Sequence, residues 1–228
     1  MLQYIFKKIV PKPRTRNIYK KNSIRKYMKI LAFTDLHEDY EFMEGLKQKA
    51  KEVDFILCAG DISVYETNLA EILSLLDELN KPIYILHGNH EEAHDLAKAC
   101  MSTKNIKFVD KQILRFKDVV IVCHGGGGFY YGPSKEDKEF ESLQSIFEDA
   151  IKSSKYSILM THAPPLKTKL DIIWSGKHVG SKAYRNFIKR VQPTIAISGH
   201  IHEASGVQDT LGKTLLVNPG PEGIIIEI

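Results

Sequence analysis

The chain has 228 residues, of which 43% are hydrophobic and 26% charged. This balance is typical of a soluble globular protein and excludes a disordered chain. No apolar run approaches the ~18 residues of a transmembrane helix, and the basic segment FKKIVPKPRTR breaks up any signal-peptide core near the N-terminus. The three cysteines are odd in number and far apart, which favours buried free thiols and a cytoplasmic location.

The net charge of +4 hides an asymmetry along the chain. Residues 1–34 contain ten Lys or Arg and no Asp or Glu, whereas the remainder holds 22 basic and 28 acidic residues, a balance of −6. We expect a basic arm at residues 1–27 and a single domain at residues 28–228. Such arms bind nucleic acid or anionic membranes, or they are solvated tails. Both interpretations stay open, and Met28 is also a candidate translation start.

The first part of the domain alternates between apolar runs and amphipathic segments. Strands are predicted at residues 29–34, 53–61 and 81–91, and helices at residues 41–51 and 67–80. Thr67 is the expected N-cap of the second helix. Strands that alternate with helices predict a parallel sheet covered by helices.

The second part contains shorter strands. Residues 107–111, 113–116 and 119–123 are separated by charged turns, which suggests antiparallel pairing. Helices are expected at residues 134–154 and 180–191, capped by Ser134 and Ser181. Buried strands are predicted at residues 156–160 and 193–197. The segments 205–209, 214–220 and 223–228 are expected to form hairpin strands, with Gly212 in the first turn.

Metal-binding side chains follow five of the predicted strands. These residues are Asp35 and His37, Asp61, Asn89 and His90, His162, and His200 and His202. Each alone is typical of a turn or of a core histidine. Ligands bind at the carboxyl ends of strands in sheets of this kind, so the whole set favours one shared site. If His90 is left out, seven ligands remain, which is more than one metal ion needs. A mixture of imidazole and oxygen ligands suits Mn, Fe, Zn, Co or Ni.

The motifs DLH (35–37), GD (60–61), GNHE (88–91), TH (161–162) and GHIH (199–202) resemble the five-block pattern of the calcineurin-like metallophosphoesterase superfamily. The end of the chain is similar to small prokaryotic phosphodiesterase-like members. The resemblance implies an α/β fold, a four-layer αββα sandwich of mixed sheets with a dimetal site at the carboxyl edge of the strands.

The resemblance also implies residue roles. Asp35, His37, Asp61 and His202 would hold the first metal, and Asp61, Asn89, His162 and His200 the second. His90 would be the catalytic histidine. The expected cofactor is a pair of divalent transition-metal ions, with Mn preferred over Fe, Zn, Ni or Co. The expected reaction is attack of a dimetal-bridged hydroxide on a phosphodiester or small organic phosphate.

The sequence departs from the patterns of well-known branches of this superfamily in several positions. The second block reads GDISVYE, without the Asp and Arg of protein serine/threonine phosphatases, so that activity is not expected. Glu91 stands where the family commonly has Asp. His87 occupies a frequent proline position and is interpreted as structural in preference to a role beside the metal ligands.

Two further segments carry open alternatives. The glycine run in CHGGGGFYYG (123–132) either presents amides to a phosphate or forms a flexible turn. Trp174 and His178 either face a substrate or serve packing and capping.

Three functions remain in competition. The leading hypothesis is a metal-dependent phosphoesterase acting on a small-molecule phosphoester. A DNA or RNA nuclease that uses the same site is favoured only by the basic arm. A non-catalytic binding scaffold of this fold is the third candidate, although all the expected ligands are present. The sequence predicts no transmembrane segment and leaves the oligomeric state open.

Overall fold

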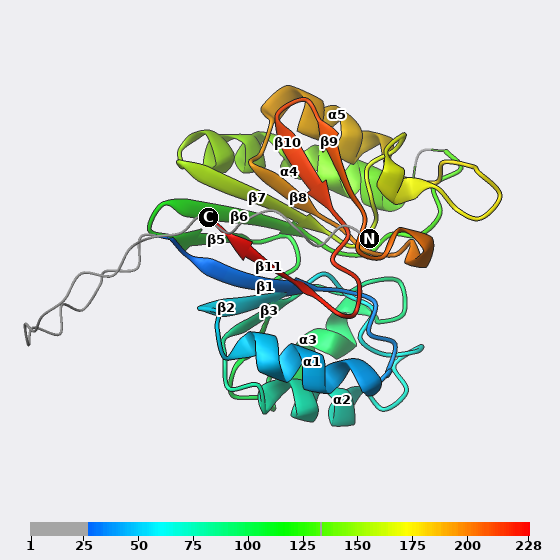
Figure 1. Ribbon diagram of the computed structural model, residues 1–228. Coiled ribbons are helices and arrows are strands. Elements are labelled where there is room, and N and C mark those ends of the chain that lie inside the picture. Colours follow the sequence, from blue (N-terminus) through cyan, green and yellow to red (C-terminus); the bar gives the residue numbers. More distant parts are fainter. Residues whose placement is uncertain (1–26, 133) are drawn as a thin grey trace, which may run out of the picture.

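The chain folds into two stacked mixed β-sheets, each covered by helices on its outer face (Figure 1). The computed structural model describes residues 27–132 and 134–228. The order of layers is helices, sheet, sheet, helices, which confirms the predicted αββα sandwich. Among the described residues, no helix has the length and apolar composition needed to cross a bilayer.

The first sheet has the strand order β11-β1-β2-β3-β4. Its strands are β1 (Lys29–Phe33), β2 (Phe55–Cys58), β3 (Ile83–Ile85), β4 (Ile106–Phe108) and β11 (Ile224–Glu227). Strands β1 to β4 are parallel and β11 is antiparallel to β1. The covering helices are α1 (Glu41–Ala50), α2 (Leu69–Asp77) and α3 (Ala93–Cys100) (Figure 1).

The second sheet has the order β5-β6-β7-β8-β10-β9. Its strands are β5 (Ile113–Phe116), β6 (Val119–His124), β7 (Tyr156–Thr161), β8 (Ile195–Ile197), β9 (Gln208–Leu211) and β10 (Thr214–Val217). Its outer face carries α4 (Lys135–Lys152) and α5 (Lys182–Val191) (Figure 1). Two short 3₁₀ helices, η1 (Lys169–Asp171) and η2 (His202–Ala204), lie in the loops.

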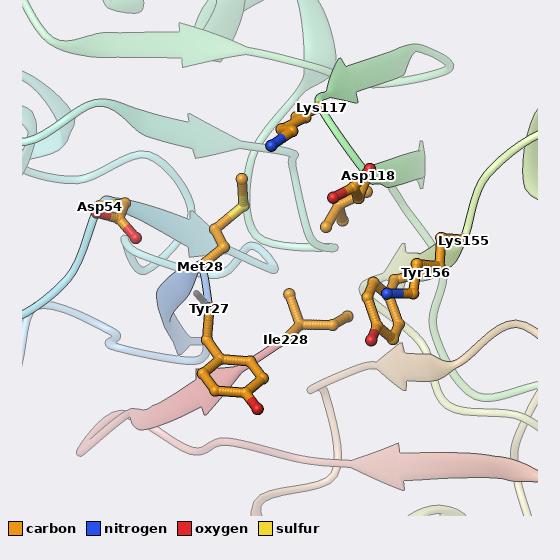
Figure 2. A pocket seen from close by; sticks show the side chains of 9 residues that line it. Tyr27, Met28, Asp54, Lys117, Asp118, Lys155, Tyr156 and Ile228 are labelled. Carbon is orange, nitrogen blue, oxygen red and sulfur yellow. The ribbon is translucent and has the colours of Figure 1, made fainter. Parts of the chain in front are cut away.

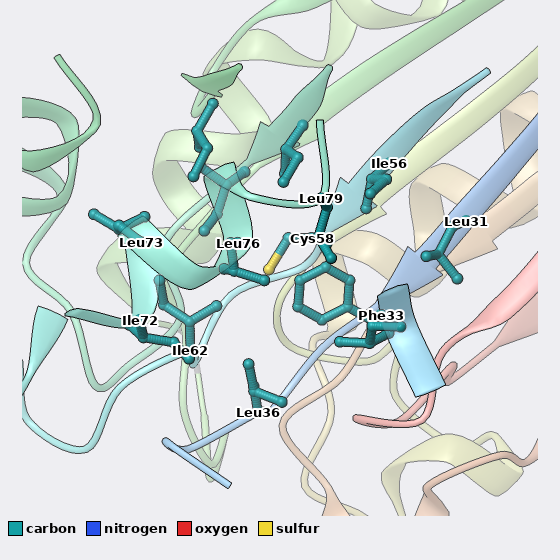
Figure 3. Packing of buried hydrophobic residues seen from close by; sticks show 14 of the residues in the cluster. Leu31, Phe33, Leu36, Ile56, Cys58, Ile62, Ile72, Leu73, Leu76 and Leu79 are labelled. Atoms are coloured by element: carbon teal, nitrogen blue, oxygen red, sulfur yellow. The ribbon is translucent and has the colours of Figure 1, made fainter. Parts of the chain in front are cut away.

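Period-two alternation along the strands builds two apolar layers at once. In β1, Leu31 and Phe33 pack in the cluster beneath the first set of helices (Figure 3), whereas Ile30 and Ala32 pack between the sheets. Successive strand side chains point to opposite faces, so a strand buried on both sides is apolar throughout. A third cluster fills the space between the second sheet and its helices. The three layers hold the carboxyl ends of the central strands in fixed positions.

Several local predictions are confirmed. The Ser134 and Ser181 side chains accept hydrogen bonds from Asp137 N and Tyr184 N at the starts of α4 and α5. Gly212 lies in the β9–β10 turn with φ +68°. The three cysteines are free and buried. The predicted basic arm lies outside the described residues except for Tyr27, and stays a prediction.

Three predictions about elements are wrong. Strand β4 pairs parallel with β3 in the first sheet, whereas antiparallel pairing with the next strands was expected. Strand β11 pairs with β1 and not with β10. Thr67 does not cap α2, because the N-cap is Asn68 and the Thr67 hydroxyl donates to Glu38 and to the Val64 carbonyl.

The wrong pairing of β4 follows from a helix that the sequence analysis missed. Helix α3 lies between β3 and β4, and a helix that crosses from one strand to its neighbour makes the two strands parallel. The N-cap of α3 is Glu92, which makes no side-chain capping bond. The helix therefore lacks the usual start signal.

Candidate metal centre

The eight residues predicted at the strand ends meet at one edge of the two sheets. A pocket of about 410 Å³ opens there, and five of the eight residues line it. The lining residues are Asp61, Asn89, His90, Gly128, Phe129, His200, Ile201, His202 and Glu203. Asp35, His37 and Asp61 follow strands of the first sheet, and His162 and His200 follow strands of the second. The site therefore lies across both sheets.

The first group of ligand atoms consists of Asp35, His37 and His202, whose donor atoms all lie within 4.8 Å of one another. The Nε2 atoms of His37 and His202 are 3.0 Å apart. The Asp35 carboxylate accepts the His200 backbone N–H, which fixes its orientation. Three donors that converge in this way suit one transition-metal ion.

The second group consists of Asp61, His162 and His200, within the same distance limit. His162 Nε2 lies 3.2 Å from Asp61 Oδ2 and 3.1 Å from Asn89 Oδ1, so Asn89 belongs to this group. His37 Nε2 lies 3.8 Å from the same Asp61 oxygen. Asp61 therefore belongs to the second group and also lies close to a member of the first. A third grouping joins His37, Asp61 and His90.

The hydrogen bonds of the histidine side chains are compatible with metal binding. His162 Nδ1 lies 2.8 Å from the Ala59 carbonyl oxygen, which can only accept, so the neutral ring carries its proton on Nδ1 and has the Nε2 lone pair available to a metal that displaces the second proton. His200 Nε2 and His90 Nδ1 are buried and have no hydrogen-bond partner within the described residues. Buried polar atoms without partners are rare in native proteins. A metal ion bound there would give His200 Nε2 its missing partner.

The electrostatics of the site also favour bound cations. Burial raises the pKa of Asp35, and the neighbouring Asp61 raises it further. Burial lowers the pKa of His200 to about 3, and His162 acts in the same direction. Burial also lowers the pKa of His162, but the charge of Asp61, its hydrogen bond and the charge of Asp35 together outweigh burial and raise that pKa to about 9. Two adjacent buried carboxylates repel one another, and cations between them remove that repulsion.

Four of the expected ligands have a left-handed backbone conformation. Asp35, His37, Asp61 and His200 have φ values of 54°, 44°, 52° and 68°. Non-glycine residues adopt this left-handed region at a cost of about 1–3 kcal/mol each, and such residues cluster at functional sites. Two neighbouring glycines are required for close approach, because a Cβ at Gly88 would overlap the Asp61 carboxylate and one at Gly199 would overlap the Thr34 hydroxyl.

Glu91 has a supporting role that the sequence analysis did not find. The side chain is 4% exposed, and its carboxylate accepts hydrogen bonds from Asp61 N, Ser63 N and Oγ, and Gly88 N. It thereby joins the loop after β2 to the loop after β3. The glutamate in GNHE, treated above only as a departure from Asp, was the available signal.

The residues with open alternative roles, His87, the glycine run, Trp174 and His178, are not members of the metal-ligand groups. The ring of His87 lies against Gly125 and Gly126 of the glycine run. The amide of Gly125 donates to Asp110 and that of Gly126 to the His87 carbonyl, so these two amides are not free for a phosphate. His178 pairs with the buried Asp171, and neither His178 nor Trp174 lines the pocket.

A second cavity, of about 560 Å³, lies at the opposite edge of the sheets (Figure 2). Its wall includes the amino ends of β6 and β7, at Val119 and Tyr156, together with Lys117 and Lys155. None of its lining residues belongs to a metal-ligand group of the described chain. Within the described residues, the metal-ligand groups lie at the carboxyl edge.

Comparison with known proteins agrees with this geometry. Residues 28–204 match the model of the family described as calcineurin-like phosphoesterase. The chain belongs to this family. An uncharacterized protein of Methanocaldococcus jannaschii, MJ1162, is 29% identical over 209 residues, which cover 88% of this chain and 92% of the relative. The calcineurin-like phosphoesterase match includes all five motif blocks quoted above.

Solved structures share the fold at low sequence identity. The protein TT1561 of Thermus thermophilus is 18% identical with a TM-score of 0.64, over 86% of this chain and 91% of that chain. A dimetal phosphatase from Danio rerio is 10% identical with a TM-score of 0.56, over 83% and 86% of the two chains. A purple acid phosphatase from yellow lupin is 11% identical with a TM-score of 0.55, over 86% and 44%. The calcineurin-like phosphoesterase sandwich is thus the fold of this chain.

Proposed function

We propose that this protein is a dimetal phosphodiesterase that hydrolyses small organic phosphodiesters. The observation that carries the proposal is the pair of adjacent ligand groups beside an open pocket, with Asp61 of one group 3.8 Å from His37 of the other. Family membership and these Asp and His groups support a metal-dependent phosphoester hydrolase. The preference for a diester substrate and for manganese is a finer proposal than family membership supports.

The proposed ligand sets follow the two groups. Asp35, His37, Asp61 and His202 hold one ion, and Asp61, Asn89, His162 and His200 hold the other, with Asp61 bridging. When bound, such a metal pair neutralises phosphoryl charge and lowers the pKa of a coordinated water. The oxygen and imidazole ligands suit manganese, with Fe, Zn, Ni and Co as alternatives.

His90 is proposed to protonate the leaving oxygen. It lines the pocket, and its backbone N–H donates to Asp61 Oδ1 over 2.9 Å, which places it beside the ligands. The ring of Tyr65 lies 4.4 Å from the ring of His90, centroid to centroid, and restricts its orientation. A general acid in this position contributes about 10²–10⁴-fold when the leaving alkoxide is poor.

The preference for a diester rests on the charges of the pocket. None of its nine lining residues, all in the described part of the chain, is Lys or Arg. A monoester dianion, a polyphosphate or a nucleic-acid strand carries further negative charge that such residues normally offset. A small diester carries a single negative charge. The pocket therefore suits it better, and the nuclease alternative depends on the arm outside the described residues.

A substrate panel tests this function. Protein freed of metal and reloaded with Mn²⁺ is expected to hydrolyse bis-p-nitrophenyl phosphate faster than p-nitrophenyl phosphate, with little action on DNA. Parallel samples loaded with Fe²⁺, Zn²⁺, Ni²⁺ or Co²⁺ identify the preferred metal. A faster monoester reaction, or hydrolysis of DNA alone, would contradict the proposed preference.

The division of ligands predicts unequal defects in two histidine variants. His200→Ala is expected to weaken the site of His162 and Asn89, because it removes a buried donor from that group. His202→Ala is expected to weaken the site of Asp35 and His37. Metal titration followed by calorimetry should show one strong site left in each variant. Loss of both sites to the same extent in both variants would count against the division.

A further inference from the structure

One exposed aromatic side chain forms part of the wall of the metal-centre pocket. Phe129 is 51% exposed and lies beside Gly128, His200 and Glu203 in the lining. Single exposed apolar residues are common and by themselves indicate nothing. Phe129 differs because it stands next to the ligands. Tyr65 is exposed too, but it does not line the pocket and its ring already contacts His90.

The loop that carries Phe129 is anchored on both sides. Before it, Gly125 N donates to Asp110 and Gly126 N to the His87 carbonyl. After it, Tyr130 N donates to the Val179 carbonyl over 2.8 Å. The Phe129 ring meets the His200 ring edge to face, with centroids 5.1 Å apart. These contacts hold an aromatic surface close to an expected metal ligand before any substrate arrives.

The polar groups of the pocket indicate which other chemical groups a bound substrate would carry. Glu203 uses one carboxylate oxygen to accept the backbone N–H of Trp174, which leaves its other oxygen as an acceptor for a hydroxyl group. Neither Lys nor Arg lines the pocket, so a second phosphate has no cationic partner there. The chemistry that matches is one phosphoryl group, an uncharged planar ring and hydroxyl groups. A nucleoside ester has all three.

We propose that Phe129 determines substrate specificity by stacking on a planar ring in the organic part of the phosphoester. The ester is bound through its phosphoryl group at the metal centre, so this inference rests on the proposed function. Aromatic side chains stack on bases with little dependence on base identity, because every base has a π-face. The favoured substrate class is therefore nucleoside-like phosphoesters rather than phosphoesters of glycerol or other ring-free alcohols.

The experiment compares two ligands of which only one carries a planar base. Calorimetry measures the affinity of Mn²⁺-loaded protein for AMP and for ribose 5-phosphate, and metal content is measured for every variant. Both ligands are phosphate monoesters of the same charge, so the weaker fit of a monoester affects them equally and does not alter their comparison. The wild-type protein is expected to bind AMP more tightly. Phe129→Leu keeps an apolar side chain but removes the π-face. It is expected to lower the affinity for AMP about 5- to 150-fold, which is the effect of losing one base–aromatic stack. Its affinity for ribose 5-phosphate should not change.

Two further variants separate stacking from structural support. Phe129→Trp keeps an aromatic face and should retain the preference for AMP. Tyr40→Leu alters an aromatic residue of similar exposure, 42%, that does not line the pocket, and should leave both affinities unchanged. Equal binding of AMP and ribose 5-phosphate by the wild-type protein would overturn the inference. An equal loss of both ligands in Phe129→Leu would do so as well.

The two proposals fail in different ways. A protein that selects AMP through Phe129 but hydrolyses no phosphodiester contradicts the proposed function alone. A protein that hydrolyses diesters while Phe129→Leu keeps its full affinity for AMP contradicts only the stacking role.

Discussion

Asp61→Asn is expected to abolish the paired metal centre while leaving the fold intact. The amide keeps the volume of the carboxylate and an oxygen that can accept the His90 N–H, but it loses the negative charge and one of the two acceptor oxygens. In the proposed assignment Asp61 bridges the two ions: it belongs to the group of His162 and His200, and its Oδ2 lies 3.8 Å from His37 Nε2 of the other group. A metal pair contributes several kcal/mol to transition-state stabilisation, so kcat/KM should fall by about a thousandfold or more.

The measurement combines metal analysis with kinetics on bis-p-nitrophenyl phosphate. Asp149→Asn makes the same chemical change at an exposed position on α4 and is the matched control. Circular dichroism melting confirms that both variants fold. The proposed bridging role would be wrong if Asp61→Asn retained two metals per chain and most of the wild-type rate.

His90→Gln is expected to lower the rate without removing the metals. If His90 protonates the leaving oxygen, the loss depends on how poor that leaving group is. An alkyl diester should lose about 10²–10⁴-fold, whereas a p-nitrophenyl diester, whose leaving group needs no proton, should lose far less. Paired measurements of kcat on the two substrate types at constant metal content test this dependence.

His94→Gln is the matched control for this experiment. His94 is exposed in α3, four residues after His90, and belongs to none of the metal-ligand groups. It should retain wild-type rates on both substrates. An equal loss on both substrates in His90→Gln, accompanied by loss of metal, would instead make His90 a ligand. The grouping of His90 with His37 and Asp61 allows that outcome.

The convergence of the ligands could be predicted from sequence because it follows from strand direction. Strands β1, β2 and β3 are parallel, as are β7 and β8, so residues that follow these strands share an edge. The i, i+2 spacing of Asp35 and His37, and of His200 and His202, marked two of these ends. Neither pair is on a strand: His37 and His200 have left-handed backbones, and His202 begins η2.

The partners of the short strands could not be predicted from local pattern. A three-residue strand such as β4 carries too few side chains to identify its neighbour, and a missed helix changes the expected direction of pairing. The place of β11 beside β1 is set by contacts between the two ends of the domain, including the ion pair of Lys29 with Glu227. Such long-range contacts leave no periodic trace in the sequence.

Two features of the site also lack a sequence signal. The left-handed backbone at Asp35, Asp61 and His200 is imposed by surrounding contacts, since a carboxylate or imidazole residue does not require it. Phe129 follows a glycine run that fits equally well a phosphate-binding loop or a turn. Only the position of its ring beside His200 distinguishes it from any other exposed aromatic residue.

The position of the ligands across both sheets has a consequence for the whole molecule. Asp35 and Asp61 follow strands of one sheet, and His162 and His200 follow strands of the other, so an ion bound by either ligand group would connect the two sheets at this edge. Ligand binding to the native state alone stabilises it in proportion to the logarithm of ligand concentration. If the proposed centre binds its ions, the free energy of unfolding would therefore rise with the metal concentration.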